Sequence, residues 1–179
     1  YMVEDDISFK SAVELALCIR KKEISPVELT EVILNRAEEI QARLNPFITI
    51  AHDVARVEAK IAEKSVMDGD DLGSLHGVPF TVKDLVNTAG VKTTFGSFAF
   101  KDNGPQIDSI GVARLRRAGG ILLGKTTTPE FGHKPMTEGP LFGRTLNPWG
   151  NNLTSGGSSG GAAVAAATGL GPLHVGTDG

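Results

Sequence analysis

Residues 8–66 carry apolar side chains at helical spacing with polar residues between them, which predicts three amphipathic helices. The first covers residues 8–22. The second begins at Ser25-Pro26-Val27-Glu28, where the serine caps the helix, the proline suits its first turn and the glutamate reaches back to the cap. This helix is expected to end at Asn45-Pro46. The third helix, over 53–66, carries alternating charges and is expected to present a solvated face.

After a loop over 67–74, strand-like and helix-like stretches alternate along the chain. In the strand predicted over 77–84, Val78, Phe80 and Val82 share one face and Lys83 lies on the other. The elements expected after it are a helix over 109–118, a strand over 121–123, a long irregular segment over 126–149, a helix over 160–168 and a strand over 173–177. This order predicts an α/β fold in which helices cover the sheet.

Composition and charge narrow the class of protein. The formal net charge of −3 argues against a nucleic-acid surface, and no apolar run is long enough to span a bilayer. The acidic stretch Glu4-Asp5-Asp6 differs from the basic start of a signal peptide, and the single cysteine, Cys18, can form no internal disulfide. We therefore expect a cytoplasmic protein.

Several familiar site patterns fail on their context. Residues 119–126 match a phosphate loop, but a predicted helix precedes them and a predicted strand fills the stretch that would cradle the phosphate. The four histidines are scattered, no Gly-x-Ser-x-Gly turn is present, and the spacings of a histidine metal pair are missing. We predict no metal, no cofactor and no histidine base.

Lys83 and the loop over 156–161 remain as candidate chemistry. A lysine in an apolar strand is either a snorkelling side chain at a sheet edge or a desolvated base. Burial can lower its pKa by about 3–5 units from about 10.4, so that a neutral amine can accept the proton of a hydroxyl. Ser158 and Ser159 lie between two glycine pairs, which is typical either of a linker or of a site at a helix N-terminus.

Taken together and in order, these stretches resemble the amidase signature family over roughly the last hundred residues. The matching stretches are 77–84 (GVPFTVKD), 118–126 (AGGILLGKT), 142–149 (FGRTLNPW), 156–161 (GGSSGG) and 176–179 (GTDG). The resemblance implies an α/β fold with a mixed β-sheet covered by helices on both faces, here incomplete. Residues 1–179 would form the N-terminal part of one domain, with a helical region over 1–66 and the start of the signature core over 75–179.

The resemblance also implies a Ser–cis-Ser–Lys triad that hydrolyses a carboxylic acid amide to the acid and ammonia or an amine. Lys83 matches the base, and Ser158 matches the bridging serine that follows a cis Gly157–Ser158 bond. Gly132 and Ser158 match positions that line the acyl pocket.

The end of the chain matches the turn that carries the family's nucleophile. Gly179 matches the start of the backbone turn that forms the oxyanion hole and contacts substrate. Thr177 and Asp178 match positions that brace this turn. The nucleophilic serine of the family would lie just beyond Gly179, and the chain stops in a predicted strand and glycine turn, so we expect an inactive fragment of an amidase.

Two other functions stay open. One is the A subunit of a glutamine-dependent aminoacyl-tRNA amidotransferase, although 128–132 and 177–179 resemble the general amidases more. The other is a non-catalytic binding module. The expected partner is a small-molecule amide, with no nucleic acid and no membrane, and a homodimer is one open alternative for the oligomeric state.

Overall fold

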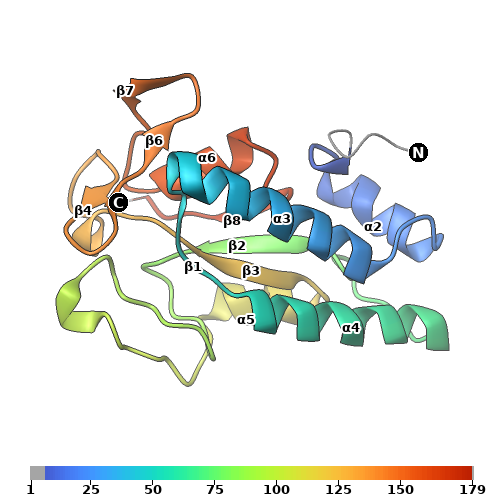
Figure 1. Ribbon diagram of the computed structural model, residues 1–179. Helices are drawn as coiled ribbons and strands as arrows, with labels where there is room; N and C mark the ends of the chain where they lie inside the picture. The colour runs from blue at the N-terminus through green and yellow to red at the C-terminus, as the bar shows by residue number, and fades with distance from the viewer. Residues whose placement is uncertain (1–6, 179) are drawn as a thin grey trace.

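The computed structural model describes residues 7–178, in which helices lie on both faces of a four-stranded mixed sheet (Figure 1). The strand order is β1-β3-β2-β8, with bounds Phe47–Ile50, Ile121–Thr126, Pro79–Lys83 and Leu173–Val175. β2 is parallel to both of its neighbours, whereas β1 is antiparallel to β3. The expected α/β class with a mixed sheet is confirmed, and the strand that ends at Lys83 is an inner one.

The N-terminal helices begin where local capping residues place them. In α2 (Ala12–Arg20) the Ser11 hydroxyl accepts the Glu14 N–H and the Glu14 carboxylate accepts the Ser11 N–H, so the helix is shorter than the predicted 8–22. Ser25 and Glu28 form the same reciprocal pair at the start of α3 (Pro26–Leu44), as predicted. α3 ends at the left-handed Asn45.

The next segment contains an element that the sequence did not predict. β1 lies between the end of α3 and the start of α4 (His52–Asp68), in a stretch of four apolar or β-branched residues. Its strand character comes from pairing with β3, which also extends β3 to Thr126 instead of the predicted end at residue 123. Where β1 has ended, Glu58 of α4 accepts the Leu122 N–H and caps the edge of β3.

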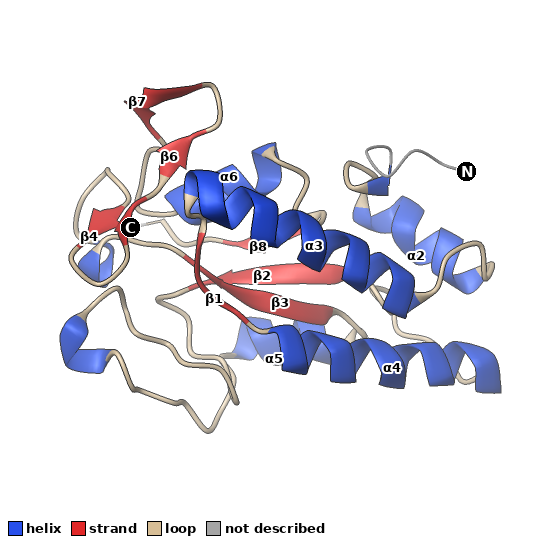
Figure 2. Ribbon diagram, in the orientation of Figure 1, coloured by secondary structure: helices blue, strands red, loops and turns tan. Residues whose placement is uncertain are grey.

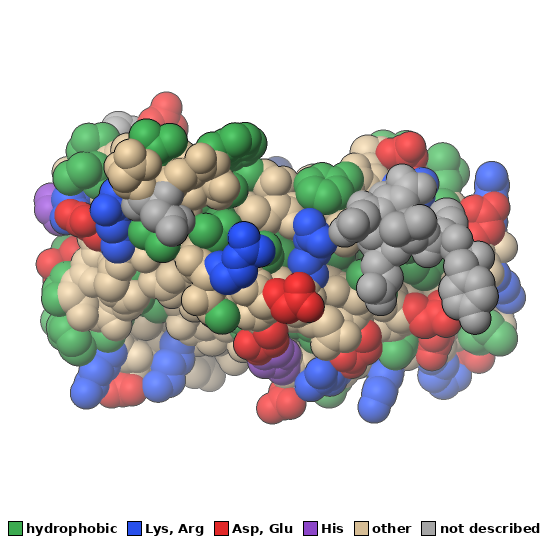
Figure 3. Space-filling model, turned by 45° about the horizontal axis from the view of Figure 1, so that its top comes forward, with side chains coloured by type: hydrophobic (Ala, Val, Ile, Leu, Met, Phe, Trp, Pro, Cys, Tyr) green, Lys and Arg blue, Asp and Glu red, His purple; other side chains and the backbone are tan. Residues whose placement is uncertain are grey.

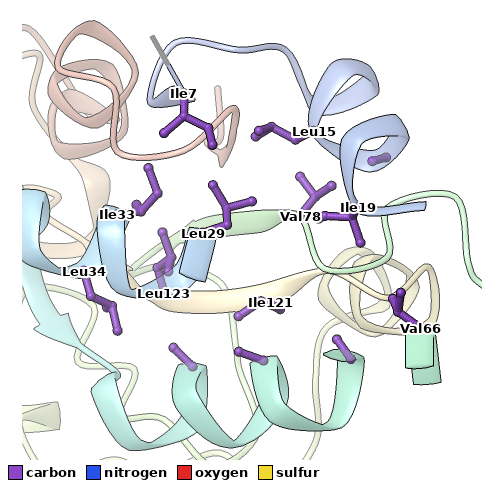
Figure 4. Packing of buried hydrophobic residues seen from close by; sticks show 14 residues of the cluster. Ile7, Leu15, Ile19, Leu29, Ile33, Leu34, Val66, Val78, Ile121 and Leu123 are labelled. Atoms are coloured by element: carbon purple, nitrogen blue, oxygen red, sulfur yellow. The ribbon is translucent and has the colours of Figure 1, made fainter. Parts of the chain in front are cut away.

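Apolar side chains on both faces hold the helices to the sheet. α5 (Ile110–Arg117) inserts Val112 against Phe80, Val82 and Leu122 on one face. On the other, helices α2, α3 and α4 pack on Ile121 and Leu123 (Figure 4). α6 (Gly160–Ala167) joins α3 through a second cluster, so the loop before α6 is fixed over this face (Figure 2).

The segment predicted as irregular over 126–149 contains three short strands, two of which pair with each other and the third with a strand just beyond it. β4 (Glu138–Gly139) pairs with β5 (Gly143–Arg144), and β6 (Leu146–Asn147) pairs with β7 (Gly150–Thr154). These strands are too short to show a period in the sequence. A single-turn helix, η2 (Glu130–Gly132), lies in the same segment, and another, η1 (Phe98–Phe100), lies between β2 and α5.

The surface carries charges of both signs. Figure 3 shows acidic and basic side chains interspersed over one face. Among the residues described, no helix is both long and apolar enough to cross a bilayer.

Candidate active site

Lys83 is the last residue of β2, and its side chain is fully buried. β2 is flanked by β3 and β8, both parallel to it, so the ends of three strands meet at the lysine. The sheet-edge alternative for Lys83 is therefore wrong, because neither its strand nor its side chain lies at an exposed edge.

Three hydroxyl groups surround the Lys83 amine. Its Nζ lies 2.6 Å from Ser158 Oγ, 3.0 Å from Ser159 Oγ and 2.9 Å from Thr177 Oγ1. The Thr177 carbonyl oxygen is farther away, at 3.5 Å. Hydroxyls can either accept from an amine or donate to it, so this shell accommodates both the charged and the neutral lysine.

The serine loop, residues 156–161, places both hydroxyls on the lysine. The Gly157–Ser158 peptide bond is cis, as the resemblance implies. Ser159 precedes α6 but does not cap it, because its hydroxyl donates to the Thr177 carbonyl at 3.1 Å and accepts the Thr177 N–H at 3.2 Å. The loop and the segment after β8 are therefore joined directly at the lysine.

Electrostatics make Lys83 a candidate base. Burial lowers the pKa of Lys83 below its ordinary value, and the carboxylate of Asp178 opposes the shift. An amine with a lowered pKa, 2.6 Å from a hydroxyl, can take that proton.

The other predicted residues fall around this centre. Gly132 has a left-handed φ of +69°, and a Cβ built on it would lie 3.4 Å from Ser158 Oγ, so Gly132 lies beside Ser158. Thr177 contacts the lysine directly, a closer relation than the bracing predicted for it. Gly179 lies outside the described residues.

The geometry agrees with the comparisons to known proteins. The sequence model of the amidase family matches residues 28–179. This chain belongs to the amidase signature family.

The relatives of this chain include enzymes of several kinds. It is 40% identical to an acylamidase of Rhodococcus erythropolis, over 99% of this chain and 37% of the relative. It is 42% identical to an indoleacetamide hydrolase of Bradyrhizobium diazoefficiens, over 94% of this chain and 32% of the relative. The A subunit of the glutamyl-tRNA(Gln) amidotransferase of Geotalea daltonii is 41% identical, over 89% of this chain and 33% of the relative.

Solved structures agree with the fold. A bacterial aryl acylamidase of the amidase signature family superposes with a TM-score of 0.88 at 35% identity, covering 93% of this chain and 35% of that one. A fatty acid amide hydrolase superposes with a TM-score of 0.94 at 27% identity, covering 99% and 32%. The chain thus spans about a third of the length of these relatives.

A second buried lysine, Lys125, lies on the opposite face of the sheet from Lys83. The register between β2 and β3 shifts after Phe80, so Lys125 pairs with Val82 and not with Lys83. Its ammonium donates to Val86 O, Thr88 Oγ1 and Thr93 Oγ1, at 2.6, 2.9 and 2.8 Å.

Through these bonds Lys125, which lies in β3, holds the loop that follows β2. Burial lowers the pKa of Lys125 to about 8, while Asp84 and Asp108 oppose the shift. All three N–H donors of the Lys125 ammonium are bonded within the protein. Most of the phosphate-loop pattern, residues 119–126, forms the strand β3, and helix α5 precedes it. The phosphate-loop pattern thus lacks the strand–loop–helix context that phosphate binding needs.

Sequence reasoning gave no role to Ser159, although it noted both serines. The signal available was its position beside Ser158 in the same glycine-flanked loop.

The four histidines each hydrogen-bond a group outside the serine loop. Within 7–178 no cluster of three or more His, Cys, Asp or Glu side chains has the geometry to hold a metal ion.

Proposed function

We propose that this chain supplies the base and the relay serine of an amidase that hydrolyses a small-molecule amide to the acid and ammonia or an amine. The observation that carries the proposal is the buried Lys83 amine, 2.6 Å from Ser158 Oγ at the end of an inner strand. A neutral lysine beside a serine can replace the Ser–His arrangement of other hydrolases.

In the proposed mechanism, protons move along one line. Neutral Lys83 takes the proton of Ser158 Oγ, which takes the proton of the nucleophilic serine as that serine attacks the amide carbonyl carbon. The proton returns through Ser158 to the leaving nitrogen when the C–N bond breaks. Water then adds to the acyl ester by the same relay, and the acid is released.

The nucleophile and part of the oxyanion hole are not among residues 1–179 in this proposal. By resemblance the nucleophile follows Gly179, whose turn would donate backbone N–H groups to the oxyanion. Thr177 and Asp178 brace that turn, and Gly132 with Ser158 lines the acyl pocket. Residues 1–179 alone are therefore expected to hydrolyse no amide. The single cysteine supports a reducing compartment such as the cytoplasm.

Replacing Lys83 by methionine in the complete gene product tests the base. The change keeps most of the side-chain volume and removes the amine, so we expect turnover to fall by at least about 10²-fold. Because the hydroxyls of Ser158, Ser159 and Thr177 lose a buried partner, stability also falls, and turnover is compared well below the melting temperature of the variant. Lys101→Met, at an exposed lysine, is the matched control and should retain turnover. Near-native turnover in Lys83→Met would refute the assignment.

A second candidate function is that of an amidotransferase A subunit. It is favoured by the 41% identity to the Geotalea daltonii protein. In that case the same residues would release ammonia from glutamine to a partner subunit. Co-purification with a tRNA-binding partner, together with glutamine as the preferred amide, would decide for it over the standalone hydrolase.

A further inference from the structure

The serine loop packs against the backbone of residues 134–136. A Cβ built on Gly157 would lie 2.8 Å from the Pro135 carbonyl carbon and 2.9 Å from the Met136 nitrogen. No side chain fits between two backbones at that separation, so the glycine allows the loop to lie directly on this segment. The position of Ser158, the next residue, is thus set partly by a segment that contributes no group to the lysine.

Thr137 follows this segment and bonds both ends of the loop. Its hydroxyl donates to Gly156 O at 2.8 Å and accepts the Gly160 N–H at 3.0 Å. Its own N–H donates to Gly156 O at 3.0 Å. The side chain is only 2% exposed, so water does not compete for these bonds.

The bond from Gly160 has a specific physical reason. Gly160 is the first residue of α6, and the first N–H groups of a helix have no partner within the helix. Ser159 stands at the cap position, but its hydroxyl is bonded to the backbone of Thr177. The Thr137 hydroxyl therefore accepts the Gly160 N–H in place of a cap by Ser159. The Ser159 hydroxyl stays within hydrogen-bond distance of Lys83.

We propose that Thr137 is the positioning residue of the serine loop, holding Ser158 Oγ at the Lys83 amine. The expected effect on kcat rests on the proposed amide hydrolysis. Thr137 hydrogen-bonds neither the lysine nor Ser158, and it acts by fixing the backbone of the loop on both sides of Ser158. A misplacement of about 1 Å at a reacting group can cost about 10²-fold in rate, so removing the hydroxyl is expected to act mainly on kcat.

The test compares Thr137→Val and Thr137→Ser in the complete gene product. Valine keeps the shape and removes the hydroxyl, whereas serine keeps the hydroxyl. Thr168→Val is the matched control, because this buried threonine also donates a hydroxyl bond, to Val164 O, but lies at the far end of α6. We expect kcat to fall about 10- to 100-fold in Thr137→Val, with KM within about threefold, and to stay within about threefold in the other two variants.

A second readout does not depend on hydrolysis. The ¹³Cε signal of Lys83, assigned by its loss in Lys83→Met, reports the titration of the amine. Thr137→Val is expected to move the midpoint of that titration, and Thr137→Ser and Thr168→Val are expected to leave it in place. If Thr137→Val does not fold, Thr137→Ala removes the same hydroxyl without crowding and replaces it in both measurements.

Each outcome decides a separate point. An unchanged kcat and unchanged Lys83 titration in Thr137→Val would overturn the inference, as would equal losses in Thr137→Val and Thr168→Val. If the parent hydrolyses no amide, the proposed function fails, and the Lys83 titration alone then decides whether Thr137 positions the loop.

Discussion

Replacing Lys125 by methionine tests whether the second buried lysine is structural. Methionine has a similar length and no charge, so the change removes the ammonium with little change in packing volume. The Lys125 side chain is fully buried, and its three bonds go to residues in the loop that follows β2.

The size of the effect follows from what the substitution leaves behind. Val86 O keeps a donor, because the Thr88 hydroxyl also donates to it at 3.0 Å. The Thr88 and Thr93 hydroxyls lose the ammonium as a hydrogen-bond donor, and each loss lowers the free energy of unfolding by about 1 kcal/mol or more. The buried carboxylate of Asp84 loses its nearby positive charge, although it keeps the N–H groups of Thr94 and Gly96. We expect the free energy of unfolding to fall by about 3 kcal/mol.

Urea denaturation measures this loss directly. A loss of about 3 kcal/mol corresponds to a fall of about 6–12 °C in Tm for a folding unit of about 150–250 residues. Lys101→Met, at an exposed position, is the control and should change stability by less than about 0.5 kcal/mol. The double variant Lys125→Met with Asp84→Asn should lose less than the two single variants together, because it leaves no unpaired buried charge. A loss below about 1 kcal/mol in Lys125→Met would refute the reasoning.

Two further predictions concern His174 and Gly161. Burial lowers the pKa of His174 from 6.5 to about 4, so the unfolded chain binds the proton first and stability falls as pH drops from 6.5 to 4, by about 3 kcal/mol. Urea titrations at several pH values should show that His174→Gln removes this part of the slope, and an identical slope in both proteins would contradict the assignment. In Gly161→Ala the new Cβ would lie 2.4 Å from Thr127 N, which forces a backbone shift and should cost about 1–3 kcal/mol or more. Gly104→Ala, with open space around its Cβ position, is the control, and equal stability of the two variants would count against the close contact.

Local sequence determined the helices and the motif that names the family. The capping pairs at Ser11 and Ser25 act over three residues, so the chain specifies those helix starts without help from distant segments. The strand over Pro79–Lys83 and the helix after the glycine-flanked serines follow from apolar spacing and glycine placement. The ordered stretches from residue 77 onward gave the amidase signature resemblance that the family match then confirmed.

The resemblance implied Ser158 as a partner of Lys83, but only the tertiary structure decided the burial of Lys83 and added Ser159 and Thr177 as partners. Ser158 and Thr177 lie 75 and 94 positions from the lysine, and no local preference acts over that range. The register shift between β2 and β3, which turns Lys125 to the other face, depends on strand pairing and has no signature within either strand. Strand β1 likewise acquires its structure from β3, because a strand this short cannot satisfy its own backbone groups.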